Sequence, residues 1–370
     1  MNIKINRDAL LKPLANVASI VERKHALPIL SNILIQGKDG QVQLTATDLE
    51  MQVSLSFKAD LKEEIATTIS ARKFFDITRS LPDDCVIDIA IKDSRVAVKA
   101  NKSRFAIQTL PAKDYPVMTK ASSEAVVITI SQIQLKRLLK QVEFAMAQQD
   151  IRYYLNGMLF VLEGQRIIAV ATDGHRLAYS HVDLDKAPSG NGQKQEVIIP
   201  RKTILELQHL LEDSEDPVVV SLASNQVKFN FGDVELLSKL VEGKFPDFQR
   251  VIPKGQNNKL VVSRDALQAS LQRAAILTTD KFKGVRCILS DNCLTIQSTN
   301  AEQEEAQEDI ETEYSGDKID IGFNVSYLLD VLANLKNESI QICLGDSNSS
   351  AVITLPEQEG FKYVVMPMRI

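Results

Sequence analysis

The sequence predicts an α+β fold made of three similar domains, each with two helices packed on antiparallel sheet. The first observation is an internal repeat, in which a helical segment is followed by a strand segment. Its copies span residues 6–48, 131–173 and 263–300. The equivalent residues Leu10, Leu135 and Leu267 lie 125 and 132 positions apart. A period this long indicates whole domains and not solenoid units. The second observation is that hydrophobic spacing changes from helical to alternating within each copy.

The first copy contains two helical segments. Leu10, Leu14 and Val17 share one face of a helix expected over 7–21. A second helix is expected from Ala71 and ends before Pro82, because proline disrupts a helix interior. Strands are expected at 51–57, 86–91, 96–99 and 105–109.

The other two copies repeat this order. Helices are expected at 131–147, 201–211, 263–277 and 324–335, with further strands near 218–222 and 227–231. The polar segments 118–124 and 253–259 follow proline-containing stretches and are interpreted as domain linkers, and 186–194 as a mobile loop. The expected domains are 1–122, 123–256 and 257–370.

Composition excludes several classes of protein. At 370 residues with 44% hydrophobic and 25% charged residues, the chain has the composition of a soluble globular protein. No apolar run is long enough to cross a bilayer, and the charged start lacks a signal segment, so we expect a cytoplasmic protein with no membrane partner. The four cysteines have no metal-ligand spacing. They are expected to be reduced and buried, and no metal or cofactor is expected.

The charge is unevenly distributed. The whole chain carries −5, but the six helical segments, with the last one counted over 323–336, together carry +7, which leaves −12 for the rest. If the helices share one side of the sheets, that side is basic and attracts phosphate backbones. The alternative is that these cations serve only solubility.

Long strings in all three domains resemble one family, the bacterial DNA polymerase III beta subunit, the replication sliding clamp. They are ARKFFDI (71–77), MAQQDIRYYLNGMLF (146–160), ATDGHRLA (171–178), KFPDFQRVIP (244–253), RAAILTTDKFKGVR (273–286), NAEQEEA (300–306), IGFNVSYLLDVL (321–332) and YVVMPMRI (363–370). The resemblance implies the DNA clamp fold and a head-to-tail homodimer that forms a six-domain ring. Twelve helices at about 10 Å spacing would line a hole roughly 28 Å wide, enough for a hydrated duplex.

The resemblance also implies function and partners. The ring would encircle double-stranded DNA without reading its sequence and give the polymerase processivity. Its partners would be the DNA polymerase III alpha subunit, an ATP-driven clamp loader, and other DNA polymerases and repair proteins. The chain has no GxxxxGK[ST] motif, so it is expected to be an accessory subunit and not an enzyme.

The family binds short linear motifs of its partners in a cleft between the second and third domains. Here the matching residues are Leu155, Thr172, Gly174, His175, Arg176, Leu177, Pro246, Arg250, Val251, Phe282, Asn324, Tyr327, Ser350, Val364, Met366, Pro367, Met368 and Arg369. An apolar groove with a few polar anchors suits a linear peptide, and methionines suit several partners. Asn348 departs from the aliphatic residue of the family.

The family also touches DNA with the segment after the first helix of the middle domain and with the loop 22–27. The expected DNA-contacting residues are Lys24, Arg72, Lys73, Gln149, Arg152, Tyr153, Tyr154, Arg201 and Lys202. Exposed tyrosines beside arginine can stack on bases. The alternative for Tyr153 and Tyr154 is a place in the core.

The subunit interface is expected between the first domain of one chain and the third domain of the other. Its residues would be Lys102, Arg104, Phe105, Ile107, Ile276, Leu277, Glu302, Glu304, Glu305 and Glu308. Opposite charges around an apolar centre fit a heterologous contact. The alternative for the acidic run is a solvated helix.

Two other functions are compatible with parts of the sequence. Asp173 and His175 could form a catalytic pair in a hydrolase-like enzyme, although no nucleophile motif accompanies them and the other repeats have Asp48-Leu49 and Asn300-Ala301 there. A DNA-free scaffold of the same fold would not need a basic helix face.

Overall fold

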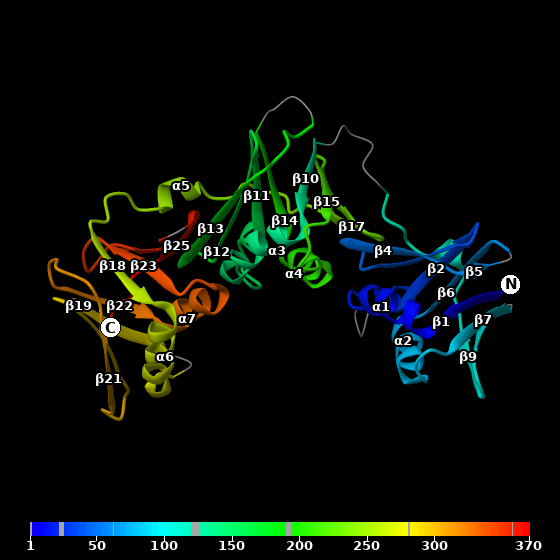
Figure 1. Cartoon of the computed structure of the whole chain (residues 1–370), viewed down its shortest axis with the longest axis horizontal. Helices are drawn as coiled ribbons and strands as arrows, with labels where there is room; N and C mark the ends of the chain where they lie inside the picture. Colours follow the sequence, from blue (N-terminus) through cyan, green and yellow to red (C-terminus); the bar gives the residue numbers. More distant parts are fainter. Residues whose placement is uncertain are drawn as a thin grey trace. The chain divides into compact units, whose positions relative to one another are not determined.

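The computed structural model describes residues 2–21, 26–61, 63–92, 94–119, 126–189, 194–279, 282–356 and 358–370, and Figure 1 labels their helices and strands. The chain divides into two compact units. The first holds 1–133, 186–191 and 205–240, and the second holds 134–185, 192–204 and 241–370. Every strand pairing between described residues is antiparallel.

The first unit contains two sheets. The five-stranded sheet has, in spatial order, β5 (Asp60–Leu61), β1 (Asn2–Asn6), β7 (Val86–Lys92), β8 (Arg95–Ala100) and β9 (Ser103–Gln108). The eight-stranded sheet has β10 (Val126–Ser131), β15 (Pro217–Leu222), β16 (Gln226–Phe231), β17 (Val234–Lys239), β4 (Met51–Lys58), β3 (Gln41–Thr47), β2 (Asn32–Lys38) and β6 (Ile65–Ser70).

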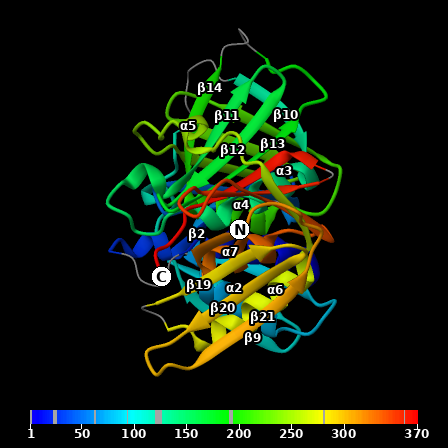
Figure 2. The ribbon, with the colours of Figure 1, turned by 90° about the vertical axis from the view of Figure 1, so that its left-hand side faces the viewer.

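The second unit also contains two sheets. Its eight-stranded sheet has β14 (Gln195–Pro200), β11 (Gly157–Glu163), β12 (Arg166–Thr172), β13 (Arg176–Asp183), β25 (Gln358–Val365), β24 (Ala351–Leu355), β23 (Ser339–Leu344) and β18 (Asn258–Ser263). The four-stranded sheet has β21 (Glu305–Glu311), β20 (Cys293–Thr299), β19 (Gly284–Ser290) and β22 (Ile319–Asn324). Figure 2 shows β19, β20 and β21 side by side.

Two longer helices come from each repeat. They are α1 (Arg7–Ala18), α2 (Ala71–Ser80), α3 (Gln132–Lys140), α4 (Arg201–Leu210), α6 (Arg264–Ala274) and α7 (Val325–Asn334), with the short α5 (Phe248–Val251) between them. Single 3-10 turns are η1 (Pro28–Ser31), η2 (Ala112–Asp114), η3 (Glu143–Ala145), η4 (Tyr153–Leu155) and η5 (Ala275–Leu277). The α1 helix packs on α2, and α6 packs on α7. The α1 helix buries Leu10, Leu14 and Val17, so the predicted stripe is its core face.

Each eight-stranded sheet joins strands of two successive repeats. In the first unit, β4 pairs with β17, and in the second unit β13 pairs with β25. Each repeat has two halves, and each half contains one longer helix that is followed by three strands. Both of these pairings use the third of those strands: Leu55 is opposite Val234 in the first unit, and Leu177 is opposite Val364 in the second. The predicted α+β architecture, with two helices and antiparallel sheet in each repeat, is confirmed.

Three expected helices end three or more residues before their predicted end. The first ends at Ala18 and not at Val21, and the last turn of the helix expected to 277 is the 3-10 turn η5. The helix expected over 131–147 ends at Lys140. After it, Ala145, Met146 and Ala147 are all buried, and three consecutive buried positions do not fit a helix with one buried stripe.

Two other expectations are wrong in part. The linker expected over 253–259 ends early, because Asn258 and Lys259 already belong to β18 and pair with β23. The alternative of an acidic helix fails for 305–311, which form strand β21. Most of the linker 118–124 and residues 190–193 of the loop lie outside the described residues.

Candidate functional site

The turn between β12 and β13 is held by its own side chains. The Thr172 hydroxyl donates to the Arg176 carbonyl at 2.6 Å and accepts from the Gly174 N–H at 3.0 Å. Oδ1 of Asp173 accepts from the backbone N–H groups of His175 and Arg176 at 2.9 and 3.1 Å. Asp173 therefore contacts the backbone N–H of His175 and not its imidazole ring.

The same turn occurs 125 residues earlier, between β3 and β4. The Thr47 hydroxyl donates to the Met51 carbonyl at 2.7 Å and accepts from the Leu49 N–H at 3.0 Å. Oδ1 of Asp48 accepts from the N–H groups of Glu50 and Met51 at 3.0 and 2.8 Å. This copy has no histidine, so the Thr-Asp pair shapes a turn of the repeat and does not indicate chemistry at His175.

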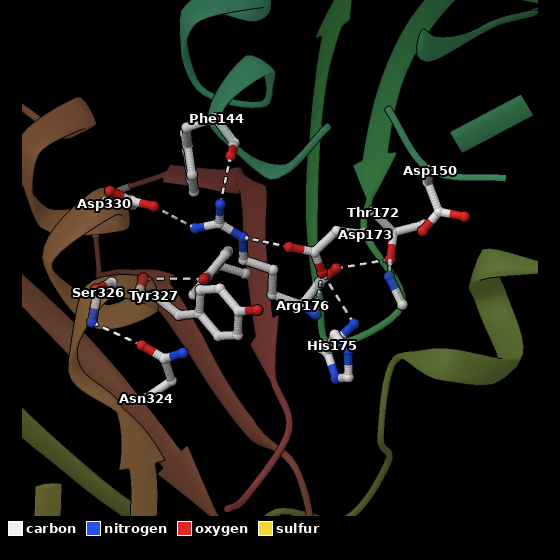
Figure 3. A network of polar contacts seen from close by, with 12 residues as sticks. Phe144, Asp150, Thr172, Asp173, His175, Arg176, Asn324, Ser326, Tyr327 and Asp330 are labelled. Carbon is white, nitrogen blue, oxygen red and sulfur yellow. Dashed lines mark hydrogen bonds and ion pairs between the residues drawn. The ribbon is translucent and has the colours of Figure 1, made fainter. Parts of the chain in front are cut away.

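Arg176 connects this turn to α7 (Figure 3). Its Nε donates to Oδ2 of Asp173 at 3.0 Å, its Nη1 to Oδ2 of Asp330 at 2.6 Å, and its Nη2 to the Phe144 carbonyl at 2.8 Å. The guanidinium lies 4.5 Å from the centroid of the Tyr327 ring, and the side chain is only 10% exposed. Arg176 is thus the centre of a buried polar network.

A buried tyrosine supports this network. The Tyr363 hydroxyl donates to the Tyr327 carbonyl at 2.9 Å, and its ring lies 5.5 Å from that of Phe144. Burial raises the pKa of Tyr363, so it is a neutral donor. Burial alone would lower the pKa of Arg176, but Tyr363, Asp330 and Asp173 raise it overall, so the guanidinium stays charged.

Part of the expected peptide site is brought together beside the network. The His175 ring stacks on Tyr327 with centroids 6.5 Å apart, and the Met366 N–H donates to the His175 carbonyl at 3.0 Å. Oδ1 of Asn324 caps α7 through the Ser326 N–H at 2.9 Å. These contacts place the end of β25, the β12–β13 turn and the start of α7 next to one another.

Other members of the expected site lie below the surface or apart from this group. Leu155, Leu177 and Val364 are buried in one hydrophobic cluster with Phe248, so they can support a binding surface from beneath. Exposed apolar surface comes from Val251, Phe282 and Met366. The remaining members have contacts of their own. Arg250 pairs with Asp247, and the Met368 N–H donates to the Gly322 carbonyl. The Ser350 carbonyl accepts from Gln256, and the exposed Asn348 belongs to a turn that Asp346 caps. Pro246 and Arg369 are exposed, and Pro367 is half-buried.

Sequence reasoning missed Asp330, Phe144 and Asp150. Asp330 lies three positions after Tyr327 on α7 and therefore on the same helical face, which is a signal that could have identified it. The Phe144 contact uses a backbone carbonyl, which no side-chain pattern indicates.

Arg152, one of the expected DNA-contacting residues, packs under the Thr-Asp turn. Its Nη2 donates to Oδ2 of Asp150 at 2.8 Å and to the Asp173 carbonyl at 3.0 Å. The Arg152 guanidinium lowers the pKa of Asp150 to about 2. A Cβ at Gly174, where φ is +92°, would lie 2.9 Å from Nη1 of Arg152, so a larger residue here would displace the guanidinium. The backbone alone does not demand glycine, since Leu49 has a φ of +76° at the equivalent position of the first repeat.

The tyrosine pair divides between surface and core. Tyr153 is 58% exposed, whereas Tyr154 is half-buried against the hydrophobic cluster. Their rings are edge-to-face, with centroids 5.8 Å apart. The core alternative therefore holds in part for Tyr154 and fails for Tyr153. Gln149 beside them is exposed.

Some of the basic residues expected to contact DNA from the helices already contact other groups of the protein. Arg72 and Lys73 are exposed on α2, and Arg72 forms a loose 3.8 Å pair with Asp76. On α4, Lys202 is exposed, but Arg201 is half-buried and donates to the Glu143 carbonyl at 3.4 Å. Lys24 lies outside the described residues.

The residues expected at the subunit interface lie on two sheet edges. Exposed Lys102 precedes β9, and the strand itself has exposed Arg104, half-buried Phe105 and buried Ile107. Acidic residues of β21 and the preceding turn are exposed, and include Glu302, Glu304 and Glu305. On η5, Ile276 is 75% exposed and Leu277 is half-buried. Glu308 already pairs with Arg273 of its own chain, with Nε donating at 2.8 Å.

The described part of the chain holds no cluster of three metal-ligating side chains. The four cysteines are free, and three of them are buried. Among the described helices, none has the length and hydropathy to cross a membrane.

Comparison with known proteins covers the whole chain. Residues 1–119, 129–247 and 249–369 match the models of the N-terminal, central and C-terminal domains of the DNA polymerase III beta subunit. The beta sliding clamps of Pseudomonas aeruginosa and Escherichia coli K12 are each 45% identical, with 100% of both chains covered.

Solved structures give the same result. The crystal structure of the DNA polymerase III subunit beta from P. aeruginosa has a TM-score of 0.96 at 44% identity, and covers 100% of both chains. A sliding clamp from P. aeruginosa bound to griselimycin also gives 0.96 at 44% identity with full coverage. The clamp from Caulobacter crescentus gives 0.91 at 34% identity, again with 100% of both chains covered.

Proposed function

The chain belongs to the DNA polymerase III beta subunit family, the beta sliding clamps, and we propose that two copies form a ring around duplex DNA that tethers the replicative polymerase. Full-length identity of 45% to beta sliding clamps supports this function. The proposed domains are 1–122, 123–256 and 257–370.

The main observation in favour of a ring is the way in which strands of successive repeats pair with one another. In two places the third strand in the first half of one repeat pairs with the third strand in the second half of the next repeat. These pairs are β4 with β17 and β13 with β25. The remaining strands of these two kinds are β21 and β9, and each lies at the edge of its sheet. A β21–β9 pairing between two chains would repeat the same junction and close a head-to-tail homodimer.

Charge and exposure agree with this pairing. Lys102 precedes β9 and Arg104 lies on it, while Glu305 lies on β21 and Glu302 and Glu304 precede that strand. Ile276, on the η5 turn that follows α6, would lose its exposed apolar surface in the contact. Glu308 would support the interface through Arg273 of its own chain.

DNA would be held chiefly by topology. A closed ring needs little binding energy and no base readout, so weak contacts suffice. Exposed Arg72, Lys73 and Lys202 on the helices and Tyr153 with Arg152 would supply them. Gln149, Tyr154 and Arg201 are secondary candidates.

Partner peptides would bind over the Arg176 network. The stacked His175 and Tyr327 rings and exposed Met366, Val251 and Phe282 offer apolar contacts, while the backbone and Arg369 offer polar ones. The partners proposed are the polymerase III alpha subunit, the clamp loader, and other polymerases and repair proteins. Catalysis is not proposed, since the Asp173 carboxylate is engaged by the turn and by Arg176. The proposed compartment is the cytoplasm, where the family acts on DNA.

Retention on DNA tests the function. The protein is loaded onto nicked circular DNA with a bacterial clamp loader and ATP, half of the circles are linearised at one site, and both samples pass through gel filtration in high salt. A topological clamp stays on circles and leaves linear DNA. Equal retention on both, or loss from both, would refute the ring and favour the scaffold.

A further inference from the structure

Two cavities occupy equivalent places in the repeat. The first, named here the α1 pocket, lies in the first unit between Ala9, Lys12, Pro13 and Asn16 of α1 and 55–57 of β4. The second, the α3 pocket, lies in the second unit between Gln134, Arg137, Leu138 and Gln141 of α3 and 180–182 of β13. Each residue that lines the α3 pocket lies 125 positions after a residue that lines the α1 pocket, and 125 residues is the spacing of the repeat.

The two pockets differ in size because their side chains differ. The α1 pocket has a volume of about 550 Å³, and the α3 pocket about 130 Å³. Ala9 stands where the second copy has Gln134, and Asn16 where it has Gln141. The smaller side chains leave the α1 pocket within the range of roughly 300–1,000 Å³ that is typical of ligand sites.

The α1 pocket is acidic. Glu212, Asp216 and Asp233 line it, and Lys12 is the single cation among the described residues that line it. Lys12 pairs with Glu212. Among the described residues, Asp216 and Asp233 form no ion pair with a lysine or arginine, so two lining carboxylates lack a cation. Arg137 stands in the α3 pocket where the α1 pocket has Lys12, but none of the described residues that line the α3 pocket is a carboxylate, so that pocket is unsuited to a second cation.

A backbone acceptor adds to these charges. Pro13 lies inside α1 and has no N–H, so the Ala9 carbonyl lacks its usual helical donor. Ala9 and Pro13 both line the pocket. Apolar walls come from Phe57 on β4 and Val234 on β17, both half-buried. The pocket therefore offers acceptors for several N–H donors beside an apolar surface.

We propose that the α1 pocket binds a short segment of a partner protein in which an arginine follows an aliphatic or aromatic residue. The guanidinium has five donors in a planar fork and suits two carboxylates and a carbonyl better than an ammonium does. The apolar residue would pack against Phe57 and Val234. This second docking site is separate from the peptide site over Arg176, so a clamp could hold two partners at once.

Titration calorimetry of the full-length protein tests the proposal. The probe is N-acetyl-Leu-Arg-amide, and its control is the citrulline analogue, which keeps the shape but has no charge. Binding of the arginine probe with a Kd in the millimolar range or tighter is expected, and roughly tenfold weaker binding of the citrulline probe. Equal binding of the two, or no heat with either, would overturn the proposal.

Two kinds of variant locate the site. Asp216→Asn with Asp233→Asn removes the charges, and Ala9→Gln with Asn16→Gln fills the pocket with the side chains of the second repeat. Both should weaken arginine binding roughly tenfold. The controls are Glu313→Gln, an exposed carboxylate of the second unit, and Met366→Ala at the Arg176 site, and both should bind as the unmodified protein does. Binding that persists in both pocket variants, or fails in Met366→Ala alone, places the peptide elsewhere and refutes the site.

Discussion

Replacing Arg176 with alanine tests whether its buried network stabilises the second unit. The substitution removes donors to Asp173, Asp330 and the Phe144 carbonyl and the contact with the Tyr327 ring. A hydrogen bond to a charged group contributes about 1.5–3 kcal/mol, and breaking a buried ion pair costs about 3–5 kcal/mol. Asp330 is 45% exposed and Asp173 keeps two backbone donors, so we expect the low end, a loss of about 3 kcal/mol.

Urea unfolding followed by tyrosine fluorescence measures this loss. The chain has no tryptophan, and of its seven tyrosines only Tyr115 lies in the first unit, so the signal reports on the second. The midpoint should fall with the slope unchanged. Asp330→Ala should cost about 1 kcal/mol, since that carboxylate is half-exposed. The double variant should lose less than the two losses added together.

A surface arginine is the matched control. Arg166 pairs with Asp183 at 2.6 Å, but both side chains are largely exposed, so Arg166→Ala should leave the midpoint nearly unchanged. If Arg176→Ala loses no more than Arg166→Ala, or less than Asp330→Ala, the reasoning from burial is refuted.

Three further predictions follow from single sites. Changing Ile276 and Leu277 to aspartate should give monomers by light scattering, because unpaired charge is costly to bury; a dimer that survives excludes this interface. The side chain of Arg152 lowers the pKa of Asp150 from 3.8 to about 2, so their contact is fully present above pH 3.8 and is lost only as the pH falls to about 2. NMR titration of the Asp150 carboxyl should show this low pKa, and Arg152→Ala should return it towards its usual value. Burial raises the pKa of Cys287 to about 12, so Ellman's reagent at pH 8 should modify it only after unfolding, and labelling in the native protein would contradict that.

The sequence by itself determined the repeat, the α+β class and most element positions. The helical face of Leu10, Leu14 and Val17, the stop before Pro82 and the alternation after Met51 reappear as α1, the end of α2 and β4. These features depend on local spacing and local backbone chemistry, which a single sequence contains. The strings that resemble one family also identify the clamp family without reference to any geometry.

Helix ends depended on distant parts of the chain. Nothing local ends the helix expected over 131–147, but burial of Ala145, Met146 and Ala147 turns the backbone after Lys140. Likewise, only strand pairing shows that the acidic run 305–311 is an edge strand beside β20. Burial and pairing with distant residues outweighed local helical spacing at both places.

Tertiary structure also decided the roles of the site residues. Asp173 and His175 are neighbours in the sequence, which suggested a catalytic pair, yet Asp173 holds a turn that Asp48 forms in the first repeat. Arg176 meets Asp330, 154 positions away, because β13 pairs with β25 and α7 packs on β25. Residues so far apart in the chain become neighbours only through the packing of whole elements, whereas the repeat that builds those elements is written in the sequence.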